Sequence, residues 1–166
     1  MKLTIVPPQG FEQYIEHAHV IHQHSQVAPW KLSTFEDCFT KPYYGVLAFD
    51  NDKIVGYSIM LEVVDEATLM DIAVDSGARG KGIGRALVDF VIETSLKNAM
   101  REIWLEVRES NHTAISLYES SEFEHIETRK NYYTVRSNDG GNNKSSGNIA
   151  QKENAKIMKW TNPNFA

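Results

Sequence analysis

The stretch DSGARGKGIGRAL, residues 75–87, places four glycines and three basic residues within thirteen positions. It follows an apolar run at 67–74 that is typical of a buried strand, and it leads into a segment, 84–97, whose apolar residues recur at helical spacing. A strand, a glycine-rich turn and a helix start bring bare backbone amides and the positive end of a helix dipole to one point. The stretch therefore predicts either a phosphate site or a plain turn into a helix with a solvated basic face.

The spacing within this stretch excludes two common phosphate-binding loops. A P-loop needs a lysine followed by serine or threonine, whereas Lys81 is followed by a glycine. The dinucleotide fingerprint G-x-G-x-x-G fails at its third glycine, where Arg85 or Leu87 stands, depending on the starting glycine. The pattern that remains is R-x-x-G-x-G at 79–84.

The composition of the whole chain narrows the class of protein. Its 166 residues are 42% hydrophobic and carry a net charge of −5, which suits a folded globular chain and gives no basic footprint for direct nucleic-acid binding. No stretch has the length of a membrane span or of a signal-peptide core, so we expect a cytoplasmic protein without membrane contact. The length predicts a single domain over 1–166.

Periodicity and turn residues predict the order strand, two helices, three strands, helix, strand, helix and two strands. Short turns join the second, third and fourth strands, so the sheet of this α/β fold cannot be wholly parallel. Residues 137–154 are rich in glycine, asparagine and serine and have little to bury, which predicts a flexible loop before the last strand.

The motif RGKGIG at 79–84 resembles the pyrophosphate-binding signature [RQ]-x-x-G-x-[GA] of the GNAT acyl-CoA N-acyltransferases. Within that family, the stretches at 82–93, 103–120 and 129–133 resemble the bacterial ribosomal-protein-alanine N-acetyltransferases, the RimI group. The resemblance implies the GNAT fold, a mostly antiparallel seven-stranded sheet splayed between strands four and five and flanked by about four helices. It also implies an enzyme that moves an acetyl group from acetyl-CoA to the N-terminal amine of a protein, with the alanine of a ribosomal protein as the first candidate.

By this resemblance, acetyl-CoA is the co-substrate, no metal takes part, and the gap between strands four and five holds the coenzyme. The residues assigned to its diphosphate and pantetheine arm are Ile72, Ala73, Val74, Arg79, Gly80, Lys81, Gly82, Ile83, Gly84 and Arg85. Asn111 matches a coenzyme-contacting asparagine of the family. From the sequence alone, a helix N-cap is an equally good interpretation of Asn111.

Acetyl transfer from a thioester to an amine needs a base for the amine and benefits from a proton donor for the thiolate. Glu106 lies in a strand-like apolar run, where burial should raise its pKa, and it matches the family's catalytic glutamate. The alternatives for Glu106 are an exposed edge-strand residue or a partner of Arg108. Tyr118 matches the family's general acid. A phenol with a pKa of about 10 stays protonated at neutral pH and can donate that proton to a leaving thiolate. Its sequence context alone predicts a core aromatic.

The acceptor site rests on weaker signals. Tyr132 and Tyr133 resemble paired aromatics beside the family's peptide cleft, although they also suit an ordinary strand, and Trp30 is a further candidate. Residues 100–127 hold seven acids and two bases, which form either an attractor for cationic peptides or a solvated acidic face. A small-molecule amine as acceptor, or a non-catalytic acyl-CoA-binding module, remains an alternative. We expect a monomer or a weak dimer.

Three features depart from the family pattern or stand outside it. Glu122 occupies a position where the family usually has glycine, so a positive φ there would carry strain of about 1 kcal/mol or more. The segment 137–154 exceeds the usual tight loop and is either a lid or an inert insertion. The histidine-rich stretch HAHVIHQH at 17–24 predicts a solvated helix face rather than a metal site, since only Glu16 could add a ligand nearby.

Overall fold

The computed structural model describes residues 2–7, 9–10, 12–135 and 151–165, and the strands within these ranges form one mixed sheet. The strand order is β1-β2-β3-β4-β5-β7-β6. All neighbouring strands are antiparallel except β4 and β5, which are parallel. This confirms the predicted seven-stranded, mostly antiparallel sheet. The strands are β1 (Leu3–Val6), β2 (Tyr43–Asp50), β3 (Lys53–Val63), β4 (Glu66–Val74), β5 (Glu102–Arg108), β6 (Glu124–Thr134) and β7 (Lys152–Thr161).

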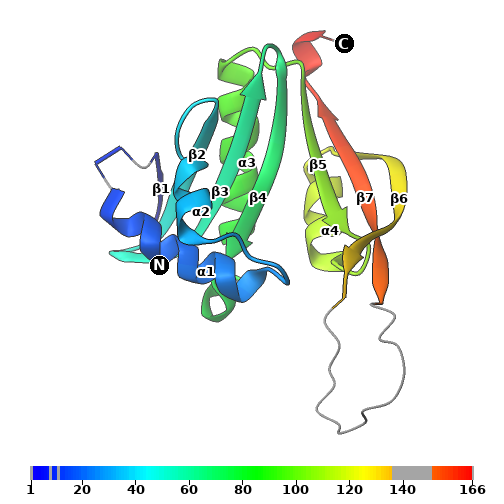
Figure 1. The fold of residues 1–166 in the computed structure, drawn as a ribbon. Coiled ribbons are helices and arrows are strands. Elements are labelled where there is room, and N and C mark those ends of the chain that lie inside the picture. Colours follow the sequence, from blue (N-terminus) through cyan, green and yellow to red (C-terminus); the bar gives the residue numbers. More distant parts are fainter. Residues whose placement is uncertain (1, 8, 11, 136–150, 166) are drawn as a thin grey trace, which may run out of the picture.

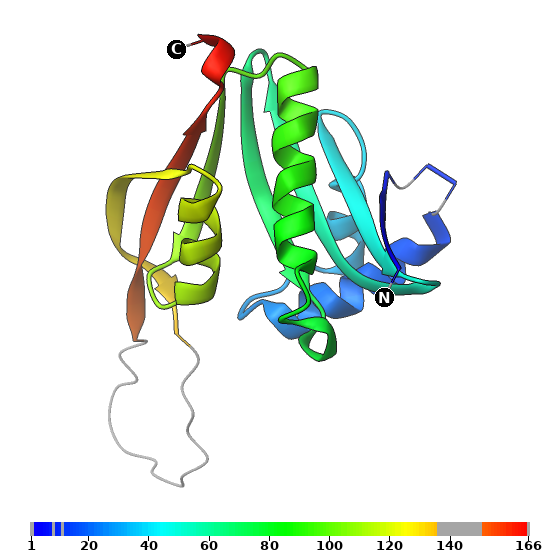
Figure 2. The same cartoon turned by 180° about the vertical axis from the view of Figure 1, so that it is seen from behind.

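Helices cover both faces of the sheet, with α1 and α2 on one side and α3 and α4 on the other (Figures 1 and 2). The four α-helices of the described ranges match the predicted number. None of them is long and apolar enough to cross a lipid bilayer. The helices are α1 (Ile15–Ser25), α2 (Leu32–Asp37), α3 (Ile83–Lys97) and α4 (His112–Ser120), with short 3-10 turns at Glu12–Tyr14, Ser76–Ala78 and Pro163–Phe165.

Helix α3 packs on the sheet through the apolar stripe that its sequence predicts. Ile83, Leu87, Val88 and Val91 lie on one face and are all buried, each contributing about 2 kcal/mol of hydrophobic stabilisation. The start of α3 lies beside α4, since a Cβ at Gly84 would be in van der Waals contact, at 3.4 Å, with a methyl group of Leu117.

Strands β4 and β5 part midway along their length, as the resemblance implies. Their pairing is confined to Glu66–Leu69 and Glu102–Leu105. A bulge at Met70 precedes the parting, because Leu69 and Asp71 pair with consecutive residues of β3 while Met70 has no partner. Beyond this point the two strands diverge (Figure 1). The paired end is closed by apolar core packing, and the other end is open.

Strand β7 begins earlier than the composition of the preceding segment suggests. Residues 152–154 of the predicted flexible loop belong to β7, where Glu153 pairs with Tyr133 of β6. Glu153 also forms an ion pair with Arg108, which ties the polar start of the strand to β5. The prediction of a loop over 137–154 is therefore wrong for its last three residues. Residues 137–150 lie outside the described residues.

Candidate active site

A cavity of about 1360 Å³ opens where β4 and β5 part. It is lined by the ends of both strands, the turn before α3, helix α4, strand β6 and the loop between α1 and α2. All the residues predicted for the coenzyme, the chemistry and the acceptor line this cavity, except Lys81, whose side chain is exposed to solvent. Segments far apart in the sequence thus meet at one cavity.

The glycine-rich turn presents open backbone to one end of the cavity. Gly80 and Gly82 have φ angles of +78° and +81°, which favour glycine, and an added Cβ at either would meet no atom within 4 Å. Gly82 is the N-cap of α3. In the described part of the chain, the amides of residues 80–85 donate to no backbone carbonyl. These amides and the helix dipole suit an anion such as a diphosphate.

The basic side chains near the turn are less free than the sequence suggests. Arg85 donates hydrogen bonds to the hydroxyls of Ser120 and Ser121 (3.3 Å for the latter), so its guanidinium links the start of α3 to the end of α4. Arg79 donates from Nε to the Val74 carbonyl at 3.4 Å. The capacity of the turn to bind an anion therefore rests mainly on its backbone amides.

Glu106 lies on the cavity wall, but its surroundings differ from the expected ones. The carboxylate is exposed and forms a 3.1 Å ion pair with Arg129 of β6, so the burial expected from the sequence is absent. Hydrogen bonding to Glu106 raises the pKa of the Tyr132 phenol. Arg108 pairs instead with Glu153 at 3.0 Å, so Glu106 is not its partner, and β5 pairs with β7 along its whole length rather than forming an edge.

Tyr118 is both a core aromatic and a cavity residue. It is 5% exposed, and its ring centroid lies 5.7 Å from that of Phe123. Burial, followed by the negative charge of Asp71 and the neighbouring Tyr133, raises its pKa above the ordinary value of a phenol. A group that remains protonated through the neutral range suits a proton donor.

Asn111 and Glu122 mark the two ends of α4. The Asn111 side chain accepts a hydrogen bond from the Ala114 amide at 3.3 Å, which confirms the N-cap interpretation, and the residue also lines the cavity. Glu122 has a φ of +68°, as its place in the family pattern predicts. The helix thus ends on a residue in the left-handed conformation.

The acceptor side of the cavity is aromatic. Tyr132 and Tyr133 form an edge-to-face pair with centroids 4.9 Å apart, and burial raises the pKa of Tyr133 to about 12. Trp30 faces the same cavity from the α1–α2 loop.

Several acids of residues 100–127 pair with basic residues of β6 and β7, so this segment is not a uniformly negative surface. The pairs are Glu102 with Lys159 (3.8 Å), Glu106 with Arg129 (3.1 Å) and Glu127 with Arg129 (3.8 Å).

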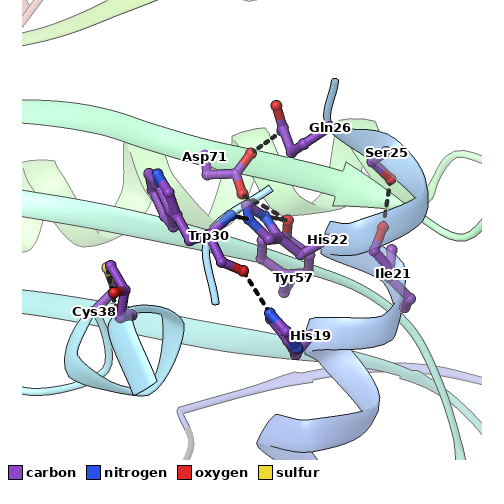
Figure 3. A network of polar contacts seen from close by, with 10 residues as sticks. His19, Ile21, His22, Ser25, Gln26, Trp30, Cys38, Tyr57 and Asp71 are labelled. Atoms are coloured by element: carbon purple, nitrogen blue, oxygen red, sulfur yellow. Dashed lines mark hydrogen bonds and ion pairs between the residues drawn. The ribbon is translucent and has the colours of Figure 1, made fainter. Parts of the chain in front are cut away.

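The structure corrects the prediction for the histidines of α1. His17 and His24 are exposed as expected, but His19 and His22 are only 6% and 2% exposed. His22 contacts Asp71 of β4, a cavity residue that the sequence reasoning missed (Figure 3). The signal was available, because both histidines lie in phase with the apolar stripe of α1, and Asp71 interrupts the apolar run 69–74 of β4. No group of three potential metal ligands occurs in the described ranges.

Comparison with known proteins finds similarity to a family model, to named relatives and to solved structures. The model of the acetyltransferase (GNAT) family matches residues 11–123. The ribosomal protein bS18-alanine N-acetyltransferase of Escherichia coli K12 is 40% identical over 116 residues, which are 70% of this chain and 78% of that protein. The crystal structure of the ribosomal-protein-S18-alanine N-acetyltransferase from Escherichia coli has a TM-score of 0.81 at 34% identity, covering 96% of this chain and 94% of that one.

A more distant structure carries the coenzyme. A Bacillus subtilis acetyltransferase in complex with CoA is similar in fold, with a TM-score of 0.72 at 17% identity, covering 96% of this chain and 99% of that one.

Proposed function

The chain belongs to the acetyltransferase (GNAT) family, and on that premise we propose that it moves the acetyl group of acetyl-CoA to the N-terminal α-amine of a protein. Alanine is the first candidate for the acceptor residue, because the relatives at 40% and 36% identity are ribosomal protein bS18-alanine N-acetyltransferases. A ribosomal protein as substrate would place the enzyme in the cytoplasm. The observation that carries the proposal is the single cavity that joins an anion-binding turn to Glu106 and Tyr118.

The turn before α3 and the end of β4 that parts from β5 form the proposed binding site for acetyl-CoA. The amides of residues 80–85 would hold the diphosphate, with Arg79 adding charge, while Asn111 lines the same cavity. The edge of residues 72–74 that faces β5 offers backbone groups to the pantetheine arm, because β4 pairs there with β3 but no longer with β5.

The choice of an α-amine follows from its acidity. At pH 7 an α-amine with a pKa of about 7.8 is roughly 10–15% neutral, whereas a lysine with a pKa of about 10.4 is only about 0.04% neutral. A modest base is therefore enough for an N-terminus. Glu106 is assigned that role, through a water molecule, and its ion pair with Arg129 must loosen when it takes the proton.

The proposed reaction uses two side chains, one that accepts a proton and one that donates a proton. The neutral amine attacks the thioester carbonyl and forms the carbon–nitrogen bond, which leaves a positive charge on nitrogen and a negative charge on oxygen. The nitrogen loses a proton to Glu106, the carbon–sulfur bond breaks, and Tyr118 gives its proton to the departing thiolate. Tyr118 is assigned as the donor because its phenol is protonated at neutral pH and lines the same cavity as Glu106.

The test is a comparison of acceptors with the purified chain and acetyl-CoA. A short peptide that begins with alanine should gain one acetyl group at its α-amine, located by mass spectrometry. The same peptide with a blocked N-terminus and an internal lysine serves as the control for side-chain transfer. Transfer to polyamines or amino sugars, with none to the peptide above the uncatalysed rate, would contradict the proposal.

A further inference from the structure

Asp71 is a buried carboxylate on the wall of the cavity, and it receives three hydrogen bonds, two from α1 and its C-cap and one from β3. His22 Nδ1 of α1 and the Tyr57 hydroxyl of β3 reach its Oδ2 at 2.8 and 2.6 Å. Gln26 Nε2, just after α1, donates to its Oδ1 at 2.9 Å (Figure 3). A carboxylate offers about four acceptor positions, so Oδ1 retains one.

The hydrogen bonds of His22 fix its protonation state. The Trp30 amide donates to Nε2 at 2.9 Å, so this nitrogen carries no proton and the proton lies on Nδ1, where it faces Asp71. The imidazole is therefore neutral. Tyr57 is a donor as well, because burial and then the charge of Asp71 raise its pKa. Every partner of Asp71 thus donates a hydrogen bond to it, and the arrangement suits the carboxylate anion.

Asp71 lacks the cation that a buried carboxylate normally has. Across residues 2–7, 9–10, 12–135 and 151–165, no lysine or arginine lies within ion-pair distance of it. Glu106, in contrast, already has Arg129 at 3.1 Å. A desolvated anion without a counter-charge is unfavourable, and a cation that enters the cavity would relieve that penalty.

The position of Asp71 relative to Tyr118 indicates which part of the cavity its charge controls. Asp71 and Tyr118 line the same cavity from opposite sides of the parted strands, one on β4 and the other on α4. The charge of Asp71 reaches the Tyr118 phenol and contributes to its raised pKa. Gln26 and Trp30, held by the same network, form the adjoining wall.

We infer that Asp71 forms an anionic subsite that binds the protonated α-amine of the acceptor. The inference rests on the proposed function and adds to it the residue that receives the amine. Its free Oδ1 position can accept one N–H of an ammonium group. The same charge would stabilise the positive nitrogen that forms when the neutral amine attacks the thioester. Since three donors already stabilise the carboxylate, Asp71 binds the amine, and the proton goes to Glu106.

The test uses two peptides that differ only in the charge of their first group. One begins with alanine, and the other begins with a propionyl group, which has the shape of alanine without its amine. Both are titrated by calorimetry into the full chain loaded with CoA, which has no acetyl group to transfer. At pH 6.5 roughly 95% of the α-amine is protonated. The wild-type protein should prefer the alanine peptide by about 10-fold or more.

Variants identify the carboxylate responsible. Asp71→Asn should bring the two affinities within about twofold of each other, whereas Glu106→Gln should keep the preference. Asp89→Asn, at an exposed position of α3, controls for the loss of one negative charge. A preference that survives in Asp71→Asn overturns the inference, even if both affinities fall, because that result shows a role in positioning alone.

Two further outcomes are informative without a folded Asp71 variant. Equal binding of the two peptides by the wild-type protein overturns the inference directly. The acetylation assay separates the two proposals: peptide acetylation without a preference for the ammonium group refutes only the Asp71 subsite. Absence of acetylation refutes the proposed function itself.

Discussion

Replacing Glu122 by glycine should stabilise the protein, because this residue ends α4 in a conformation that suits glycine. Its φ is +68°. The Phe123 amide donates to the Tyr118 carbonyl, and the Glu122 amide donates to the Glu119 carbonyl, at 3.0 and 3.1 Å. These bonds and the contact of the Phe123 ring with Tyr118 are those of a Schellman motif, in which the left-handed position is usually glycine.

The expected gain is the difference between two terms. A left-handed conformation costs a residue with a Cβ about 1–2 kcal/mol. Glycine also makes the unfolded chain more flexible, which lowers the free energy of unfolding by about 0.4–1 kcal/mol and offsets part of this gain. The free energy of unfolding should therefore rise by about 0.5–1 kcal/mol, which corresponds to about 1–4 °C in melting temperature for a chain of this size.

Urea denaturation of Glu122→Gly, Glu122→Ala and the wild-type protein measures this difference. Alanine removes the same carboxylate but keeps the Cβ, so it should not give the gain. Glu124→Gly, in strand β6 with ordinary backbone angles, should be destabilised by about 0.5–1 kcal/mol. Equal stability of the glycine and alanine variants at position 122 would refute the reasoning. Acetyl transfer by Glu122→Gly should remain at the wild-type rate, since the hydrogen bond to the Tyr118 carbonyl is unchanged.

Three other predictions concern the site. Glu106→Gln should lower kcat about 100- to 10,000-fold while calorimetry finds CoA binding unchanged. Tyr118→Phe should lower kcat about 100-fold. Because burial raises the Tyr118 pKa, the phenol of the wild-type enzyme should keep its proton beyond about pH 10. A wild-type kcat that falls between about pH 8 and pH 10, with no such fall in the phenylalanine variant, would contradict that assignment. Gly82→Ala should lose about 0.5–1 kcal/mol of stability and weaken CoA binding, whereas Gly77→Ala, with an unstrained φ, should do neither.

Local signals predicted the parts of the fold that short stretches of chain determine. The residues that determine the apolar stripe of α3 and the turn at 79–84 lie close together in the sequence, and both features were correctly predicted. The side-by-side placement of these parts came from the family resemblance. The polar start of β7 was not predictable from composition, because Glu153 is stabilised by Arg108, 45 residues away.

The missed parts of the site depend on contacts between distant segments. His22 and Asp71 are 49 residues apart and meet only because α1 packs across β3 and β4. The ion pair of Glu106 with Arg129 likewise depends on the register of β5, β7 and β6. The histidine was predicted to lie on a solvated helix face, and Asp71 was given no role. Their combined role follows from the tertiary structure.

Because β4 and β5 part, a small change in the angle between them at the paired end displaces the open end, where the site lies. Leu69 and Leu105 pack at this apex, in the core cluster, while Val74 stands at the open end. Five residues of strand separate Leu69 from Val74, or about 17 Å, so a change of about 3° in the angle between the strands displaces the open end by about 1 Å. A displacement of that size at reacting atoms can slow a reaction about 100-fold. Exchanges among aliphatic side chains at the apex could therefore retune catalysis without touching any substrate.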